Sequence, residues 1–194
     1  IILAASIVVG LTACGSMKAP TYQPVNKSLL QQRQASPGLS GWPDLATWEE
    51  GEPSPQDVAV IVAVEDYAFL PPVAGAVANA TDWEAYFRNH RGMEDVFVLT
   101  NQQATREEIK RFAAQASSEA GPESTVWFVF IGHGASLTDG SDGAMIGMDA
   151  QQTITSIEAR SVKRSELLDT LEAGPQENTV VVLDTCFSGR DPEG

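Results

Sequence analysis

The sequence predicts an α/β domain built on a parallel sheet with helices on both faces. Four short, valine-rich apolar runs recur between residues 57 and 184, and segments with helix signals separate them. Strands that alternate with helices are typical of parallel sheets, because a parallel neighbour needs a long crossover connection. The runs are apolar at successive positions rather than at alternate ones, which is expected of strands buried on both faces.

The expected strands follow one another along the chain with helices between them. The four strand segments are Asp57–Val64, Asp95–Thr100, Thr125–Gly132 and Asn178–Asp184. The three helical segments are Gly75–His90, Thr105–Ala120 and Lys163–Gly174. The second helix starts with a capping box formed by Thr105 and Glu108, and the third ends at a Gly-Pro pair. The Gly- and Asp-rich region after the third strand favours a hairpin around residues 144–159.

The composition indicates a globular, strongly acidic protein. Of the 194 residues, 43% are hydrophobic and 20% are charged, so the chain can bury a core of its own. The net charge of −14 excludes the basic footprint that nucleic-acid binding requires. An acidic field favours cationic ligands in a salt-dependent way, and its simplest role is solubility.

The first residues indicate export and lipid attachment. Ile1–Ala13 is apolar but too short to span a bilayer as a helix, and it fits the apolar region of a secretory signal. Leu11–Cys14 resembles a bacterial lipobox, which implies a lipid on Cys14. Gly15 follows in place of the Asp that favours inner-membrane retention, so we expect an outer-membrane anchor facing the periplasm. The alternatives are an ordinary signal peptide and a core helix with a chance cysteine.

These signals divide the chain into three parts. Residues 1–13 are the expected signal peptide, here without its first residues. Residues 14–56 are rich in Pro, Gln, Ser and Gly, and we expect a lipid-anchored flexible tether. Residues 57–194 are the expected catalytic domain.

Two strand ends carry residues suited to nucleophilic catalysis. His133 lies between two glycines after the third strand, and Cys186 follows the fourth. In a parallel sheet both ends lie at the same edge, where an imidazole activates a neighbouring thiol. Gly134 has no side chain, so its backbone can approach a reacting carbonyl. The backbone N–H groups of Gly134 and Cys186 are the candidate donors of an oxyanion hole. The alternatives for each residue alone are a loop histidine and a buried structural thiol.

Both motifs resemble those of a known family. "FVFIGHG" and "VVVLDTCFSG" are similar to the two catalytic motifs of caspase-like cysteine peptidases, especially bacterial metacaspase-like members. The resemblance covers roughly Asp57 to Gly189 and implies the strand order 2-1-3-4, with further C-terminal strands that this chain lacks. It also implies that His133 transfers protons, that Cys186 is the nucleophile, and that Gly134 and Cys186 supply the oxyanion hole.

The resemblance further implies a substrate pocket. Asp184 matches the acid that lines the S1 pocket in metacaspases and selects Arg or Lys at P1 by charge-assisted pairing. Asn79 stands where those enzymes have a second acid, and Ile131 stands where they often have a serine two residues before the histidine. The pocket is therefore less acidic than is usual in the family. Another interpretation of Asp184 is a strand-end acid that holds a loop amide.

The sequence predicts no required cofactor or metal. Some metacaspases need calcium, and the acids available near the motifs are Asp139, Asp142 and Asp149. Their spacing does not match an EF-hand loop, so a solvated loop is the favoured interpretation.

The expected function is a cysteine endopeptidase that acts on polypeptides with a basic P1 residue. One alternative is a catalytically silent caspase-like scaffold at the cell envelope, and another is a legumain- or gingipain-like relative. The apolar fourth strand, with no strand after it, predicts an open sheet edge through which two copies could dimerise.

Overall fold

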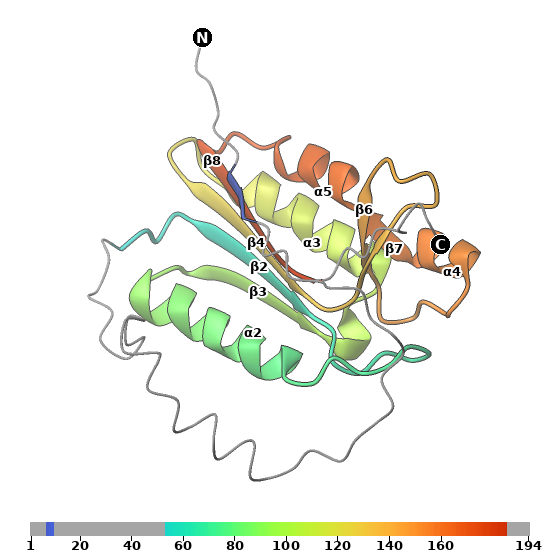
Figure 1. The fold of residues 1–194 in the computed structure, drawn as a ribbon. Helices are drawn as coiled ribbons and strands as arrows, with labels where there is room; N and C mark the ends of the chain where they lie inside the picture. Colours follow the sequence, from blue (N-terminus) through green and yellow to red (C-terminus); the bar gives the residue numbers. More distant parts are fainter. Residues whose placement is uncertain (1–6, 10–52, 186–194) are drawn as a thin grey trace, which may run out of the picture.

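A computed structural model describes residues 7–9 and 53–185 of the chain (Figure 1). Its main sheet has five strands in the order β1-β8-β4-β2-β3, and every neighbouring pair is parallel. The strands are β1 (Ile7–Val9), β2 (Val58–Ala63), β3 (Asp95–Thr100), β4 (Thr125–Ile131) and β8 (Asn178–Asp184). The four predicted strands are therefore present, and their predicted order 2-1-3-4 is confirmed as β3-β2-β4-β8.

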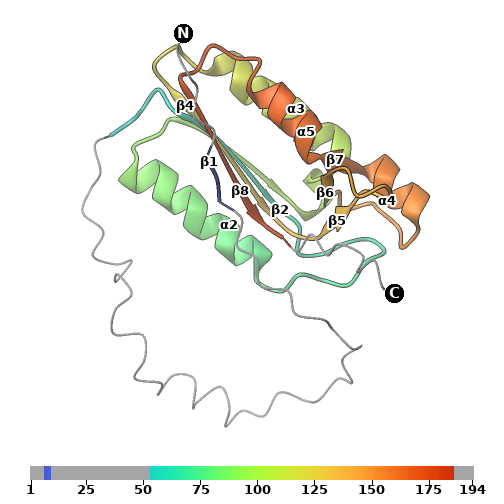
Figure 2. The same cartoon turned by 45° about the horizontal axis from the view of Figure 1, so that its top comes forward.

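Helices cover both faces of this sheet, as predicted (Figures 1 and 2). α3 (Arg106–Glu119) and α5 (Arg164–Leu171) pack on one face, while α2 (Ala76–Ala85) packs on the other. A π-helical turn, η2 (Tyr86–His90), continues α2, and a 3₁₀ turn, η3 (Asn101–Gln103), follows β3. The N-cap of α3 is Thr105, whose hydroxyl accepts from the Glu108 N–H at 3.3 Å, which is one of the two hydrogen bonds of the predicted capping box. The Glu108 carboxylate accepts from Arg111.

A small antiparallel sheet follows the histidine, and here one prediction was wrong. Its order is β5-β6-β7, formed by β5 (Gly134–Ser136), β6 (Gly143–Ile146) and β7 (Ser161–Lys163). The hairpin joins β5 to β6, so it lies mostly before residues 144–159, around which it was predicted. The second half of that segment forms α4 (Ile154–Arg160) instead, because the Thr153 hydroxyl caps it by accepting from the Ser156 N–H.

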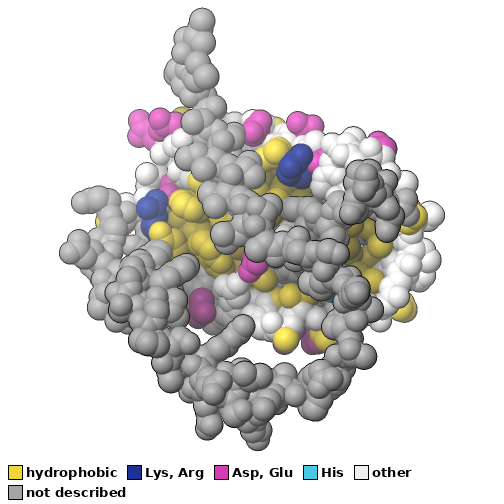
Figure 3. Space-filling view, in the orientation of Figure 1, with side chains coloured by type: hydrophobic (Ala, Val, Ile, Leu, Met, Phe, Trp, Pro, Cys, Tyr) yellow, Lys and Arg dark blue, Asp and Glu magenta, His cyan; other side chains and the backbone are white. Residues whose placement is uncertain are grey.

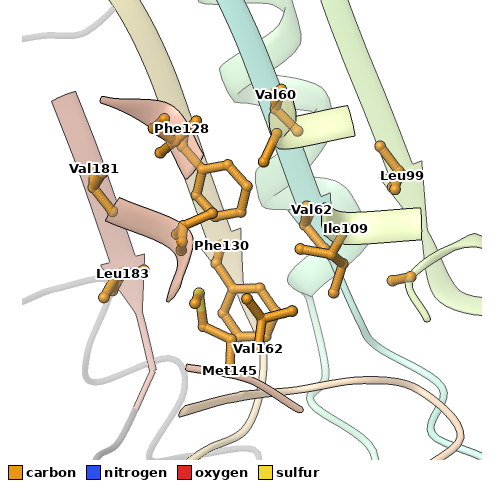
Figure 4. Packing of buried hydrophobic residues seen from close by; sticks show 14 of the residues in the cluster. Val60, Val62, Leu99, Ile109, Phe128, Phe130, Met145, Val162, Val181 and Leu183 are labelled. Atoms are coloured by element: carbon orange, nitrogen blue, oxygen red, sulfur yellow. The ribbon is translucent and has the colours of Figure 1, made fainter. Parts of the chain in front are cut away.

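The core consists of two hydrophobic layers on either side of the sheet. Every residue of β2 is buried, as predicted for an apolar strand covered on both faces. Phe128 and Phe130 of β4 point to the side of α3 and α5, where they pack with Ile109 (Figure 4). The other layer, towards α2, contains Phe87 together with alternate residues of β2 and β4.

The outer edge of β8 differs from the prediction. Ile7–Val9 forms β1 and pairs in parallel with Val180–Val182, so that stretch of the edge is not open. β1 lies inside the expected signal peptide, and removal of residues 1–13 would therefore uncover this stretch. Most of the expected tether, residues 14–52, lies outside the described residues.

An ionic network joins α3 to α5, the two helices that share one face of the sheet. The Glu166 carboxylate accepts from Arg106 Nη2 at 2.9 and 3.1 Å and is also paired with Lys110. Arg106 Nε donates to the Ser161 carbonyl at 3.0 Å, which ties β7 to the same network. Burial alone would raise the pKa of Glu166, but Lys110 and Arg106 outweigh it and hold that pKa below its ordinary value of 4.5.

The substitution Glu166→Gln should lower the free energy of unfolding at neutral pH and have little effect in acid. Because the folded-state pKa is depressed, the stability from this carboxylate is present above about pH 4.5 and is lost as the pH falls through the folded value. We expect a loss of about 0.5–1 kcal/mol at pH 7, given the partial exposure. Urea unfolding at pH 7 and pH 3 measures it, with Glu177→Gln as the matched control. An equal loss at both pH values would rule out the ionic origin.

Candidate active site

The ends of β4 and β8 lie side by side at one edge of the sheet. Their register runs from Thr125 opposite Asn178 to Ile131 opposite Asp184. The Gly132 N–H then donates to the Asp184 carbonyl at 3.3 Å, which carries the pairing one step further. His133 comes two residues after Ile131, and Cys186 two residues after Asp184. Cys186 lies outside the described residues, but the chain that leads to it ends at the same edge as His133.

The imidazole of His133 is oriented by a backbone carbonyl. Its Nε2 lies 2.8 Å from the carbonyl oxygen of Pro71, in the loop between β2 and α2. Because a carbonyl only accepts hydrogen bonds, Nε2 must carry the proton, and the lone pair of the neutral ring is then on Nδ1. A base fixed through its second nitrogen is the arrangement that activates a thiol nucleophile.

The β5–β6 pairing determines where the Gly134 amide points. The Ile146 N–H donates to the His133 carbonyl at 3.0 Å, so these residues form a hydrogen-bonded pair. The next pair, Gly134 opposite Met145, is then of the non-hydrogen-bonded kind. In such a pair the Gly134 N–H points away from β6, as an oxyanion donor must. The orientation agrees with the predicted role, which stays a prediction.

The two predicted pocket residues are brought together from distant parts of the chain. Asn79 of α2 donates from Nδ2 to Asp184 Oδ2 at 3.2 Å, across 105 positions of sequence. Asp184 is exposed at the end of β8, so its carboxylate is accessible to a ligand. This bond differs from the alternative in which Asp184 holds a backbone amide of a loop, because its donor is the side-chain amide of Asn79. The roles of both residues in substrate binding stay predictions.

Sequence reasoning missed the residues that hold the loop of Pro71. Asn101 Oδ1 accepts from the backbone N–H groups of Glu65 and Asp66, each at 2.9 Å. Glu65 Oε2 in turn accepts from the Val77 N–H at 3.1 Å, near the start of α2. Asn101 has a φ of 45°, a left-handed conformation that Asn tolerates better than most residues. The tolerance of Asn for the left-handed conformation is the one sequence signal that could have indicated a special role for Asn101.

The three acids considered for calcium make contacts with protein groups. Asp142 pairs with Arg164, Asp149 pairs with Arg160, and Asp139 accepts from Ser141 in a loop turn. Within residues 7–9 and 53–185, no group of three or more His, Cys, Asp or Glu residues lies close enough together to hold a metal ion.

Comparison with known proteins identifies the family. The model of the caspase domain, peptidase family C14, matches residues 56–194. The chain belongs to the caspase family. The match contains both motifs on which the resemblance rests, and it assigns residues 56–194 to this family.

One solved structure supports the same fold. The caspase-family domain described above is similar to protein GSU0716 from Geobacter sulfurreducens, with a TM-score of 0.57 and 20% sequence identity. The match covers 70% of this chain and 52% of that one, so the chain spans about half the length of this neighbour. At this identity the likeness concerns the fold alone. No curated protein matches the chain.

The expected lipid site is not part of the described region. Cys14 lies outside it, and so do residues 1–6 and 10–13 of the expected signal. None of the helices that the structure describes is both long enough and apolar enough to cross a membrane.

Proposed function

We propose that this chain is a cysteine endopeptidase in which Cys186 is the nucleophile and His133 transfers protons. The observation that carries the proposal is the register of β4 and β8. It ends both strands at one edge of the sheet, and in the sequence His133 and Cys186 each follow two residues after the last pair. The Pro71 carbonyl adds support, because it leaves Nδ1 of His133 as the basic nitrogen.

The reaction follows from these groups. Nδ1 of His133 takes the thiol proton, and the Cys186 thiolate attacks the scissile carbonyl carbon. The N–H groups of Gly134 and Cys186 stabilise the tetrahedral oxyanion. The imidazolium returns its proton to the leaving amine, which breaks the peptide bond and leaves a thioester on Cys186. Water, deprotonated by His133, then hydrolyses the thioester and releases the carboxylic acid.

The substrate preference in this proposal is Arg or Lys at P1. Asp184 supplies a carboxylate at the catalytic edge, and Asn79 holds one of its oxygens, Oδ2, by a neutral hydrogen bond. An accessible carboxylate pairs with a guanidinium or ammonium group. Figure 3 shows acidic side chains at several places on the described surface, and the net charge of −14 favours cationic peptides in the same direction.

The substitutions Cys186→Ala and His133→Ala should each abolish hydrolysis of fluorogenic peptides that end in Arg or Lys. We expect a fall in kcat/KM on the order of a thousandfold or more, because each removes a group that changes bonding in the reaction. His90→Ala, at the end of η2, is the matched control and should retain activity. Full activity of Cys186→Ala would refute the proposal. Failure of wild-type Cys186 to react with an Arg chloromethyl ketone would favour the silent scaffold.

Substitutions at the two proposed pocket residues, Asp184 and Asn79, should change the P1 preference. Asp184→Asn should lower kcat/KM for Arg substrates by roughly 10- to 100-fold relative to a neutral P1, because a charge-assisted hydrogen bond is lost. Asn79→Asp should raise the Arg-to-neutral ratio, since it restores a second carboxylate. Profiling with a library varied at P1 measures both ratios. Ratios that stay at the wild-type value in both variants would contradict the assignment and point to another clan member.

A separate proposal concerns location. The lipobox-like residues Leu11–Cys14 support lipid attachment at Cys14 and anchoring at the outer membrane, facing the periplasm. Wild type expressed in a Gram-negative host should incorporate an alkyne-tagged fatty acid and fractionate with the envelope, and Cys14→Ala should do neither. Equal labelling of the two proteins would exclude Cys14 as the acceptor.

Gel filtration of the processed protein tests whether the uncovered β8 edge forms a dimer.

A further inference from the structure

Tyr67 lies directly beside the histidine and has no role in the proposed reaction so far. It sits in the loop after β2 with only 9% of its surface exposed. Its hydroxyl accepts from the backbone N–H of His133 at 2.7 Å and donates to the carbonyl of Ile146 at 3.3 Å. The hydroxyl therefore connects His133, at the start of the β5–β6 hairpin, to the opposite strand.

This connection replaces one bond of the hairpin ladder. A hydrogen-bonded antiparallel pair normally exchanges two direct bonds, N–H to carbonyl in each direction. The His133–Ile146 pair makes one of them directly, from the Ile146 N–H to the His133 carbonyl. The other runs through the Tyr67 hydroxyl. The inserted hydroxyl keeps the His133 backbone further from β6 than a direct bond would.

The same loop also holds the side chain of His133. The Tyr67 ring packs against the imidazole with 4.8 Å between the centroids and 45° between the planes. Pro71, four residues later, accepts from Nε2 of the same ring. His133 is thus held at its amide, at its ring face and at one ring nitrogen, all by the loop between β2 and α2.

Gly132 provides the space for the hydroxyl. A Cβ at this position would lie 2.6 Å from Tyr67 Oη and 3.2 Å from Cζ of Phe130. The first distance is shorter than real contacts allow, so an alanine there would displace the tyrosine hydroxyl. The two glycines around His133 have different uses: Gly132 admits Tyr67, and Gly134 presents its amide.

The Tyr67 hydroxyl keeps its proton. Burial raises the pKa of this phenol well above its usual range, although the hydrogen bond from the His133 amide opposes the shift. At neutral and mildly alkaline pH the group is therefore a fixed donor to Ile146 and takes no part in proton transfer.

We infer that Tyr67 is a positioning residue for His133, and that Gly132 is present to admit its hydroxyl. The inference rests on the proposed function, in which His133 Nδ1 is the base. Without the hydroxyl, the His133 N–H can bond directly to the Ile146 carbonyl, which draws the histidine towards β6 and out of the position that Tyr67 and Pro71 give it.

The first test is Tyr67→Phe, which keeps the ring and removes only the hydroxyl. We expect kcat to fall on the order of 10- to 100-fold, because a small misplacement of a catalytic group has effects of this size. KM should change less than twofold, since Tyr67 has no part in the proposed P1 pocket. Tyr86→Phe, in η2, makes the same chemical change elsewhere and should keep wild-type kcat. A Tyr67→Phe enzyme with wild-type kcat would overturn the inference.

A double-mutant cycle that combines Gly132→Ala with Tyr67→Phe tests whether Gly132 is present to admit the Tyr67 hydroxyl. In the wild-type background the new methyl group meets the hydroxyl, and we expect a loss in kcat similar to that of Tyr67→Phe. In the Tyr67→Phe background the contact with the hydroxyl at 2.6 Å is gone and the edge of Phe130 at 3.2 Å remains, so the additional effect of the methyl group should be several-fold smaller. Equal effects of Gly132→Ala in both backgrounds would show that the glycine serves another purpose.

The imidazole resonances of His133 give a readout that does not depend on activity. NMR spectra, assigned with His90→Ala, should show these resonances shifted in Tyr67→Phe and in Gly132→Ala but not in Tyr86→Phe. A wild-type protein that cleaves no peptide would refute the proposed function, and the resonances would still decide the positioning. Unshifted His133 resonances in both variants would overturn the positioning whatever the activity.

Discussion

The site depends on one constraint, the parallel pairing of β4 with β8 in a register that ends with Ile131 opposite Asp184. Parallel strands place their carboxyl ends at the same edge of the sheet, where functional groups gather in α/β proteins. Buried side chains such as Phe128 and Val181 hold this register, because a slip of one residue would move each to the opposite face of the sheet. The hydrophobic core therefore also fixes which strand ends meet at the edge that carries His133.

The loop between β2 and α2 supplies what the strand ends lack. It brings the Pro71 carbonyl and the Tyr67 hydroxyl to His133, while Asn101 and the start of α2 hold the loop itself. The polar groups around the histidine are thus fixed from a segment that precedes it by more than sixty positions. Such support lets a partly exposed imidazole keep one orientation and one tautomer.

Sequence reasoning succeeded where the chain carries a strong local signal, such as an apolar run or a helix cap. Unbroken apolar runs predicted four of the five strands of the main sheet, and Thr105 predicted the start of α3. The hairpin was misplaced because the cap at Thr153, which starts α4, was overlooked. Asn79 and Asp184 were assigned to one pocket only through the resemblance to metacaspases. The contact of Pro71 has no sequence signature, because any residue offers the same carbonyl.

The central claim is that His133 activates Cys186, and the pH dependence of Cys186 alkylation by iodoacetamide tests it most directly. Peptide mapping separates Cys186 from Cys14, so the full chain can be used. In wild type the rate should rise with a midpoint well below the value of about 8.5 that is typical of a free cysteine. In His133→Ala the midpoint should move to about that value. Identical midpoints in the two proteins would contradict the account.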